Sequence, residues 1–244
     1  MKICLIVPCY NESNRINHTE YINYLNNHNN VFIIFVDDGS QDLTHKILLK
    51  IVEVHTDKSK LMKLSRNCGK AEAVRSGMLE AAKMQKFDYI GFWYADLATP
   101  LVEIDKFELY ICENPPVNIF IGSRIKRLGS QIIRKKTRHF LGRIFTTIIG
   151  YMTALPVYDT QCDSKIFKES EVVALFKNPF ISEWFFDVEL IFRFKKKYKQ
   201  DVLNRIIEIP LQKWEDKNKS KLSIMDFLRA PIELLKIGIA YKGY

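Results

Sequence analysis

The strongest constraint on the fold is a regular alternation of apolar runs with helix-like segments in the first hundred residues. Four runs have the length and apolar character of buried strands: 3–7, 31–36, about 60–65 and 88–95. Between these runs, apolar residues recur at helical spacing. The pattern predicts an α/β fold, in which a mostly parallel sheet is flanked by helices and its crossovers are right-handed.

The rest of the chain has a weaker pattern. It predicts a strand at about 117–122, a helix over 183–199, a strand at about 203–210 and a terminal helix from about 223. No internal repeat or linker separates these segments. We therefore expect one domain over 1–244, made of a first half at 1–100, a second half at 101–222 and a C-terminal helix at 223–244.

Polar side chains follow three of the predicted strands. They lie between Pro8 and Glu12, between Asp37 and Ser40, and at Asp96. The carboxyl ends of parallel strands meet at one rim, where ligands bind in such sheets, so we expect these side chains to share a ligand site. A turn followed by a helix that Ser40 caps is the simpler interpretation of the second cluster.

Charge composition bears on the partner. The chain has 37 Lys and Arg against 28 Asp and Glu, a formal net charge of +9. The excess favours a phosphate-bearing ligand, an acidic lipid surface or nucleic acid, unless the basic surface has no specific partner. The positive charge is concentrated after the first four strands and accompanies no nucleic-acid motif, so nucleic acid is not an expected partner.

Cysteine usage and hydropathy bear on the compartment. The five cysteines are scattered without a CxxC pair, which argues against a zinc site or a disulfide framework and favours a reducing compartment. The opening MKICLIVPCY is typical of a first buried strand rather than a signal peptide. No stretch of about 18 uncharged apolar residues occurs. We expect a cytoplasmic protein, and peripheral contact with the cytoplasmic face of a membrane stays open.

A nucleotide-sugar ligand would account for the residue types at the predicted rim. Asp37 and Asp38 can accept hydrogen bonds from ribose hydroxyls or base N–H groups. Asp96 can hold a divalent metal, since Mg²⁺ is usually bound through one or two carboxylates plus substrate phosphates. The candidates for binding phosphate are basic: Lys70, Arg124, Arg134 and Lys221.

Several motifs in the same order resemble the family 2 glycosyltransferases of the GT-A fold. They are VPCYNES at 7–13, VDDGSQDLT at 36–44, RNCGKAEAVRSGM at 66–78, ADLATP at 95–100 and GSR at 122–124. Later segments are similar to the dolichyl- or polyprenyl-phosphate β-glucosyltransferase branch: DTQCDSKIF at 159–167, SEWFFDVEL at 182–190 and WEDKNKSKL at 214–222. The resemblance covers about 3–222 and implies a Rossmann-like nucleotide-sugar-binding fold, with a nucleotide-binding half at 1–100 and an acceptor-side half at 101–222.

The resemblance implies roles for the residues that match the family motifs. The donor nucleotide-sugar would contact these: Pro8, Tyr10, Glu12, Asp37, Asp38, Lys70, Asp96 and Arg124. Asp96 corresponds to the second Asp of the family's D-x-D and would be the catalytic carboxylate that faces Mg²⁺ or Mn²⁺. The phosphate or acceptor side would include these: Arg134, Arg138, Glu189 and Lys221.

Asp187 is the second catalytic candidate that the resemblance implies. On a sugar-hydroxyl acceptor, a carboxylate at this place can serve as general base. A lipid phosphate is already an anion and needs no base, so Asp187 would then only position other groups. The simpler interpretation of Asp187 and Glu189 is a helix whose carboxylates pair with nearby lysines.

Two positions depart from the family pattern. The first Asp of D-x-D is replaced by Tyr94, which removes a carboxylate from the expected metal site and puts metal dependence in question. Asp163 stands where the family's DTQCGFK has Gly, which indicates a different local turn. Family members that act on lipid phosphates often carry transmembrane helices, and no such segment is expected here.

The expected function is inverting transfer of a hexose, with glucose the expected sugar, from a UDP-sugar to polyprenyl or dolichyl phosphate. Segments 131–152 and 223–244 combine basic and apolar residues, which suits peripheral contact with anionic lipid, although an ordinary core helix or a dimer contact explains them equally well. Two alternatives stay open. One is transfer to a saccharide hydroxyl in polysaccharide or glycolipid assembly, and the other is a catalytically impaired nucleotide-sugar-binding module.

Overall fold

The computed structural model describes residues 1–134, 136–217 and 224–242, without the side chains of 136–141, 143 and 224–228. In chain order, the elements are β1 Ile3–Cys9, α1 His18–Asn27, β2 Val31–Asp37, α2 Thr44–Val54, β3 Ser59–Lys63, α3 Lys70–Met84, β4 Tyr89–Phe92, α4 Glu103–Glu113, β5 Ile119–Ser123, β6 Gln131–Ile133, α5 Lys136–Thr153, β7 Lys165–Lys168, α6 Glu169–Phe176, α7 Phe186–Tyr198, the 3₁₀ helix η1 Lys199–Asn204, β8 Ile206–Pro210, β9 Lys213–Glu215 and α8 Ile224–Ala240.

A central sheet joins strands from both halves of the chain. Its order is β3-β2-β1-β4-β7-β5-β8, and β6 pairs with β9 in a separate two-stranded sheet. Every pairing in the central sheet is parallel except those of β7, which runs antiparallel to both β4 and β5. The predicted α/β class with a mostly parallel sheet is therefore confirmed.

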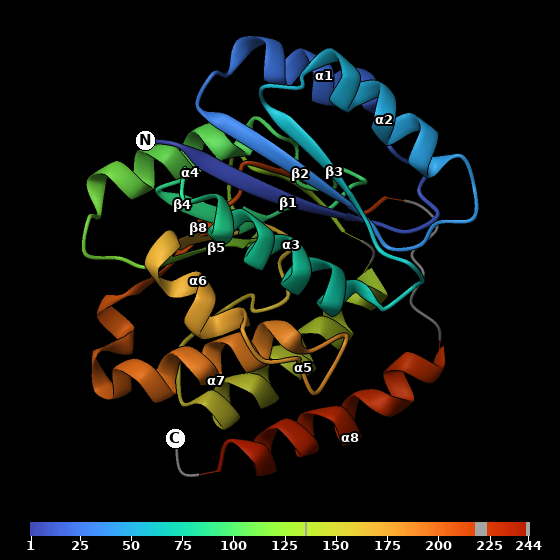
Figure 1. Cartoon of the computed structure of the whole chain (residues 1–244). Coiled ribbons are helices and arrows are strands. Elements are labelled where there is room, and N and C mark those ends of the chain that lie inside the picture. The colour runs from blue at the N-terminus through green and yellow to red at the C-terminus, as the bar shows by residue number, and fades with distance from the viewer. Residues whose placement is uncertain (135, 218–223, 243–244) are drawn as a thin grey trace.

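Helices cover both faces of the sheet (Figure 1). One apolar core packs α1, α2 and α4 against the sheet, and a second packs α3, α6 and α7 against the opposite face. Small residues let α3 approach closely: a Cβ on Gly77 would lie 2.4 Å from Cγ2 of Ile6 on β1. The continuous apolar runs of β1 and β2 are what a strand covered on both faces requires.

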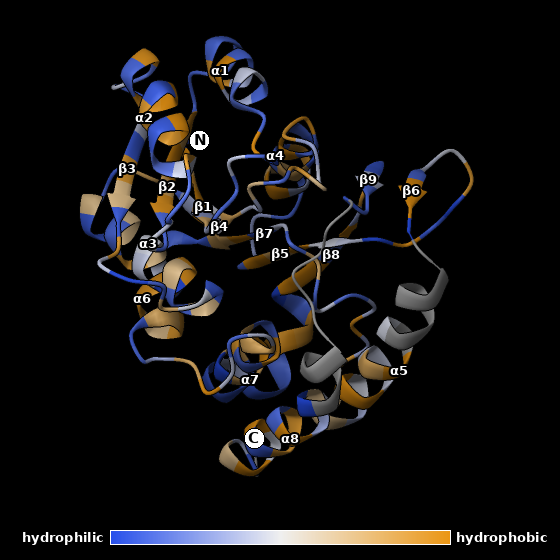
Figure 2. Ribbon diagram, turned by 90° about the vertical axis from the view of Figure 1, so that its right-hand side faces the viewer, coloured by the Kyte–Doolittle hydropathy of each residue, from blue (hydrophilic) through white to orange (hydrophobic). Residues whose placement is uncertain are grey.

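A third apolar core lies away from the sheet. It joins α5, α7 and α8 through Ile149, Val188, Phe192 and Leu234, and Figure 2 shows α5 and α8 side by side at the same end of the molecule. Pro231 lies inside α8, and the helix continues through it. The predicted terminal helix is therefore present and docks on the second half of the chain.

Local predictions were less accurate where the chain departs from simple alternation. Helix α2 begins at Thr44 after Leu43, and Ser40 does not cap it: the Ser40 hydroxyl instead accepts a hydrogen bond from the Asn11 backbone N–H at 3.1 Å. The short strand β7 was not predicted. Its four residues, KIFK, are too few to produce a recognisable period.

Candidate active site

A cavity of about 490 Å³ lies at the carboxyl ends of the parallel strands. Segments that follow β1, β2, β3, β4 and β5 line one side of it, and α5, the loop before α7, and β9 line the other. Segment 159–163 also reaches this rim. Because β7 runs antiparallel, the residues that precede it lie at the edge where the other strands end. The predicted rim site is thus a real cavity that both halves of the chain build.

Asp38, which directly follows β2, lies in the cavity lining. Its carboxylate accepts hydrogen bonds from the backbone N–H groups of Cys68 at 2.7 Å and Gly69 at 3.0 Å. Burial raises the pKa of Asp38, and these two hydrogen bonds oppose that rise. Gly69 has φ of 90°, a backbone conformation that favours glycine, and its Cα lies close to the end of the Glu183 side chain. Pro8, Tyr10 and Glu12 line the same cavity.

Asp96 lies in the cavity with a basic partner that the sequence did not indicate. The Arg15 guanidinium donates hydrogen bonds to Asp96 and to Glu12, the second at 3.2 Å. The other oxygen of Asp96 accepts from the Ala98 backbone N–H at 3.2 Å. Arg15 follows Glu12 by three residues, and this spacing was the one signal that could have suggested the contact between Arg15 and Glu12. The cluster places a cation directly beside the expected metal-facing carboxylate.

Lys70 and Tyr94 form a second pair. Lys70 begins α3, and its Nζ donates a hydrogen bond to the phenol oxygen of Tyr94. The ammonium also lies 5.5 Å from the ring centre of Trp184 and 5.3 Å from that of Phe186. Burial lowers the pKa of Lys70, while Asp187 and Asp163 oppose this effect. Tyr94 thus supplies a neutral acceptor for a buried cation where the family motif has a carboxylate.

Two arginines form the basic wall of the cavity. Arg124 donates hydrogen bonds to both oxygens of Asp159, each at 2.7 Å. Its guanidinium carbon lies 5.2 Å from the centre of the Trp214 ring. Arg124 holds the pKa of Asp159 below its usual range although burial acts in the other direction. Burial lowers the pKa of Arg134, and the nearby Arg124 charge lowers it further. An anion bound between the two arginines would relieve this repulsion.

Asp163 also lines the cavity, within reach of the Arg124 and Lys70 charges. Burial raises its pKa to about 6, the Arg124 and Lys70 charges oppose this rise, and Asp96 adds to it. Asp163 therefore lies close enough to Asp96 for their charges to interact. The sequence marked this position as a change of backbone turn, and the structure shows that it also adds a carboxylate to the cavity.

Three predicted site residues lie outside the cavity lining. Asp37 is fully buried and accepts from the Ser40 N–H and from His45, both at 2.9 Å, so it holds the loop after β2. Asp187 pairs with Lys165 at 2.6 Å beneath the cavity. Glu189 accepts from the Ile181 N–H at 2.8 Å, from Arg193 at 2.8 Å and from Tyr241 at 2.9 Å. These contacts indicate supporting rather than ligand-contacting positions.

Two further predicted residues cannot be placed. Lys221 and the side chain of Arg138 lie outside the described residues. Pattern reasoning also did not identify Arg15, Glu183, Trp184 and Trp214 as cavity-lining residues, because they join the site only through the tertiary fold.

A cavity at the carboxyl ends of a mostly parallel sheet, lined by Asp38, Asp96 and clustered basic side chains, is the arrangement of a GT-A glycosyltransferase. Residues 4–173 match the model of glycosyl transferase family 2. The chain belongs to this family and is a glycosyltransferase.

Relatives span nearly the whole chain. A dolichyl-phosphate beta-glucosyltransferase from Trichomonas vaginalis is 30% identical over 250 residues, which cover 98% of this chain and 71% of that protein. One from Mus musculus is 29% identical over 259 residues, which cover 98% of this chain and 76% of that protein.

Solved structures show the same fold at low identity. Glucosyl-3-phosphoglycerate synthase from Mycobacterium tuberculosis in complex with UDP superposes with a TM-score of 0.69 at 13% identity, over 98% of this chain and 79% of that one. A complex of that enzyme with Mn²⁺, UDP and glucosyl-3-phosphoglycerate gives 0.68 at 15% identity, over 97% and 79%.

Proposed function

We propose that this protein transfers a hexose, with glucose the expected sugar, from a UDP-sugar to a polyprenyl or dolichyl phosphate, with inversion at the anomeric carbon. The observation that carries the proposal is the cavity itself, which is lined by Asp38 after β2 and by Arg124 after β5, four strands further along the sheet, together with Arg134. A uridine beside Asp38 and a diphosphate beside the two arginines match these side chains. The relatives named for transfer to dolichyl phosphate support the acceptor class.

The reaction joins two phosphate-bearing molecules in one cavity. An acceptor phosphate oxygen attacks the anomeric carbon, the bond from that carbon to the diphosphate breaks, and UDP leaves with the bonding electrons. The attacking oxygen already carries negative charge at neutral pH, so no general base is needed. This agrees with a cavity in which Asp187 has no place on the lining and is paired with Lys165.

The protein's contribution is to stabilise charge on the leaving diphosphate. Arg124 is held rigidly by Asp159, so its orientation toward the cavity costs little reorganisation when charge develops. Lys70, held by Tyr94 among aromatic rings, adds a second fixed cation. A divalent metal would add Lewis-acid stabilisation of the same oxygens, and Asp96 is the residue that would hold it.

The acceptor side of the cavity is bounded by helices that also face outward. Gly142, Phe145 and Thr146 of α5 and Ala230 of α8 line the cavity. On α8, the exposed residues Ile232, Leu235 and Ile239 accompany the exposed bases Arg229 and Lys236. Apolar and basic side chains together suit the head-group region of an anionic membrane, where a polyprenyl phosphate resides.

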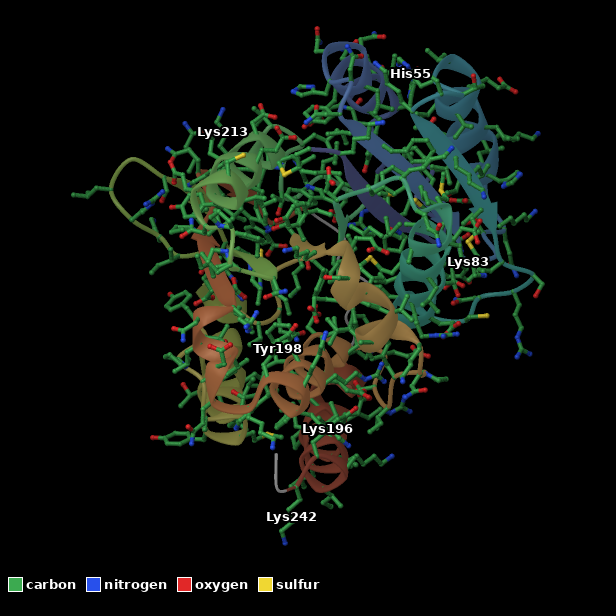
Figure 3. All side chains as sticks on the ribbon, turned by 60° about the vertical axis from the view of Figure 1, so that its left-hand side comes forward. His55, Lys83, Lys196, Tyr198, Lys213 and Lys242 are labelled. Carbon is green, nitrogen blue, oxygen red and sulfur yellow. The ribbon has the colours of Figure 1, made fainter. Side chains whose placement is uncertain are left out.

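Within the part of the chain that the structure describes, no helix is both long and apolar enough for a membrane crossing. The proposal includes peripheral contact with the cytoplasmic membrane face through the exposed apolar residues of α5 and α8. Figure 3 shows Lys242 extending from the end of α8 away from the body of the protein.

The test is a transfer assay with radiolabelled UDP-glucose and three acceptor arms: a polyprenyl phosphate in detergent, a panel of saccharides, and water. Label in the organic phase that alkaline phosphatase cannot release and mild acid can release is the expected result. Label found only on a saccharide would support transfer to a hydroxyl instead. Donor binding without turnover in any arm would support the impaired module, which the replacement of a carboxylate by Tyr94 favours.

A further inference from the structure

The pairing of β4 with β7 relates the two positions that depart from the family pattern. Tyr89 faces Lys168 and Phe92 faces Lys165 in this antiparallel ladder. The register ends at the second of these pairs, and Tyr94 and Asp163 each lie two residues further toward the cavity, so both residues enter the same part of its lining.

The electrostatics of the two residues agree with this register. After burial, the Asp163 charge is the largest influence that raises the pKa of the Tyr94 phenol. Both side chains line the cavity, as does Asp96. Asp163 therefore faces the space that a carboxylate at position 94 would also reach.

Asp163 is a cavity carboxylate that the described residues leave unpaired. No hydrogen bond or ion pair joins it to another described residue, although Arg124 and Lys70 influence it at longer range. Asp96, in contrast, is already paired with Arg15. Asp96 alone would therefore be a weak ligand for a divalent cation, and a second carboxylate would strengthen the site.

The net charge of the cavity lining also favours a bound cation. Of the described lining residues, seven are Asp or Glu and five are Lys or Arg. A nucleotide diphosphate adds further negative charge to a lining that already has an acidic excess. A divalent cation bound with the diphosphate would offset that excess.

We propose that Asp163 and Asp96 are the carboxylate pair that binds the divalent cation of the donor complex, so that the carboxylate absent at position 94 is supplied from the facing position beside β7. The proposal rests on the proposed function, because the cation enters with the diphosphate of the donor. It assigns to Asp163 a binding role, and Tyr94 remains the acceptor for Lys70.

The test measures Mn²⁺ binding directly, by the electron paramagnetic resonance signal of free Mn²⁺ in the presence of saturating UDP. Asp163→Asn is expected to weaken Mn²⁺ binding at least about tenfold. Since burial disfavours the Asp163 charge, the isosteric amide should fold, and thermal unfolding checks this. Glu113→Gln, which removes an exposed carboxylate at the end of α4 outside the cavity lining, should change Mn²⁺ affinity by less than about twofold.

A reciprocal exchange tests the facing geometry. Tyr94→Asp combined with Asp163→Gly should recover Mn²⁺ affinity to within about threefold of the original protein, because the carboxylate returns from the opposite strand. Unchanged Mn²⁺ affinity in folded Asp163→Asn would overturn the inference and leave the proposed function standing. If the original protein bound no UDP with or without Mn²⁺, the proposed function itself would fail.

Discussion

The guanidinium of Arg15 is paired with the carboxylate of Asp96 inside the cavity. Arg15 also reaches Glu12, so one cation serves two acidic side chains that lie in the family motifs. A divalent metal held by Asp96 would therefore compete with the Arg15 charge for the same carboxylate. Arg15, which lies outside the ADLATP motif, would thus influence metal binding alongside the motif residue Asp96.

Replacing Asp96 and replacing Arg15 should have opposite effects on metal binding. Asp96→Ala should lower transfer at least about a hundredfold, because a carboxylate that orients the metal and diphosphate is lost. Arg15→Gln should tighten Mn²⁺ binding roughly tenfold, since a competing positive charge is removed. Mn²⁺ titration of both variants in the presence of UDP checks this. Equal affinity in the original protein and Arg15→Gln would contradict the competition.

The buried pair of Arg124 and Asp159 should matter for folding as well as for donor binding. Arg124→Ala leaves a buried carboxylate uncompensated and should lower the free energy of unfolding by about 3 kcal/mol, measured by urea denaturation. Lys83→Ala removes an exposed surface partner and should change it by less than about 0.5 kcal/mol. A similar small change for both variants would show that the buried pair contributes little.

Thiol reactivity should separate the cysteines by burial. Burial raises the pKa of Cys162 to about 12, so its thiolate is scarce at pH 8, and Cys4 and Cys9 are also buried. In the native protein, DTNB should react rapidly only with the partly exposed Cys68 and the exposed Cys112. All the cysteines should react in guanidinium chloride. Fast native reaction at Cys162 would mean that the loop before β7 opens readily.

The outer face of α8 should determine membrane contact. Leu235 is 65% exposed and Ile239 is 74% exposed. Charged substitutions there should not disturb the core but should oppose insertion into a lipid interface. Leu235→Glu with Ile239→Glu is expected to lower co-flotation with vesicles that contain phosphatidylglycerol at least about fivefold. Leu109→Glu on α4, also exposed, is the matched control and should float like the original protein.

Much of the fold could be predicted from the sequence because its first half follows one simple physical rule. Buried parallel strands require continuous apolar runs, and β1 and β2 consist of them. Strand β7 could not be found in this way, since its four residues begin and end with Lys. The Lys165 ammonium is buried against Asp187, and this tertiary ion pair is invisible to periodicity.

The candidate site divides in the same way. Pro8 lies at the end of β1, Asp38 directly follows β2, Lys70 begins α3 and Asp96 lies four residues after β4. Local sequence therefore placed these residues at the rim, and the structure brings them into one cavity. Asp187 and Glu189 lie in an equally recognisable motif. The i,i+4 spacing of Glu189 and Arg193 agrees with the simpler interpretation that these carboxylates pair with basic side chains, whereas the partner of Asp187, Lys165, is distant in sequence and could not be predicted.

The antiparallel insertion of β7 has a consequence for how the molecule assembles. Until residues 165–168 have been synthesised, β4 has a partner on one side only, and its open edge is an unprotected template for another strand. Strand β4 is paired on both sides only once residues 165–168 join the sheet, and the segment that precedes them, 159–163, then lies at the rim of the cavity. Strand β8 and the cavity-lining residues of the loop before α7 and of β9 follow later in the chain. The sheet and the cavity at its rim are therefore completed only by segments from the second half of the chain.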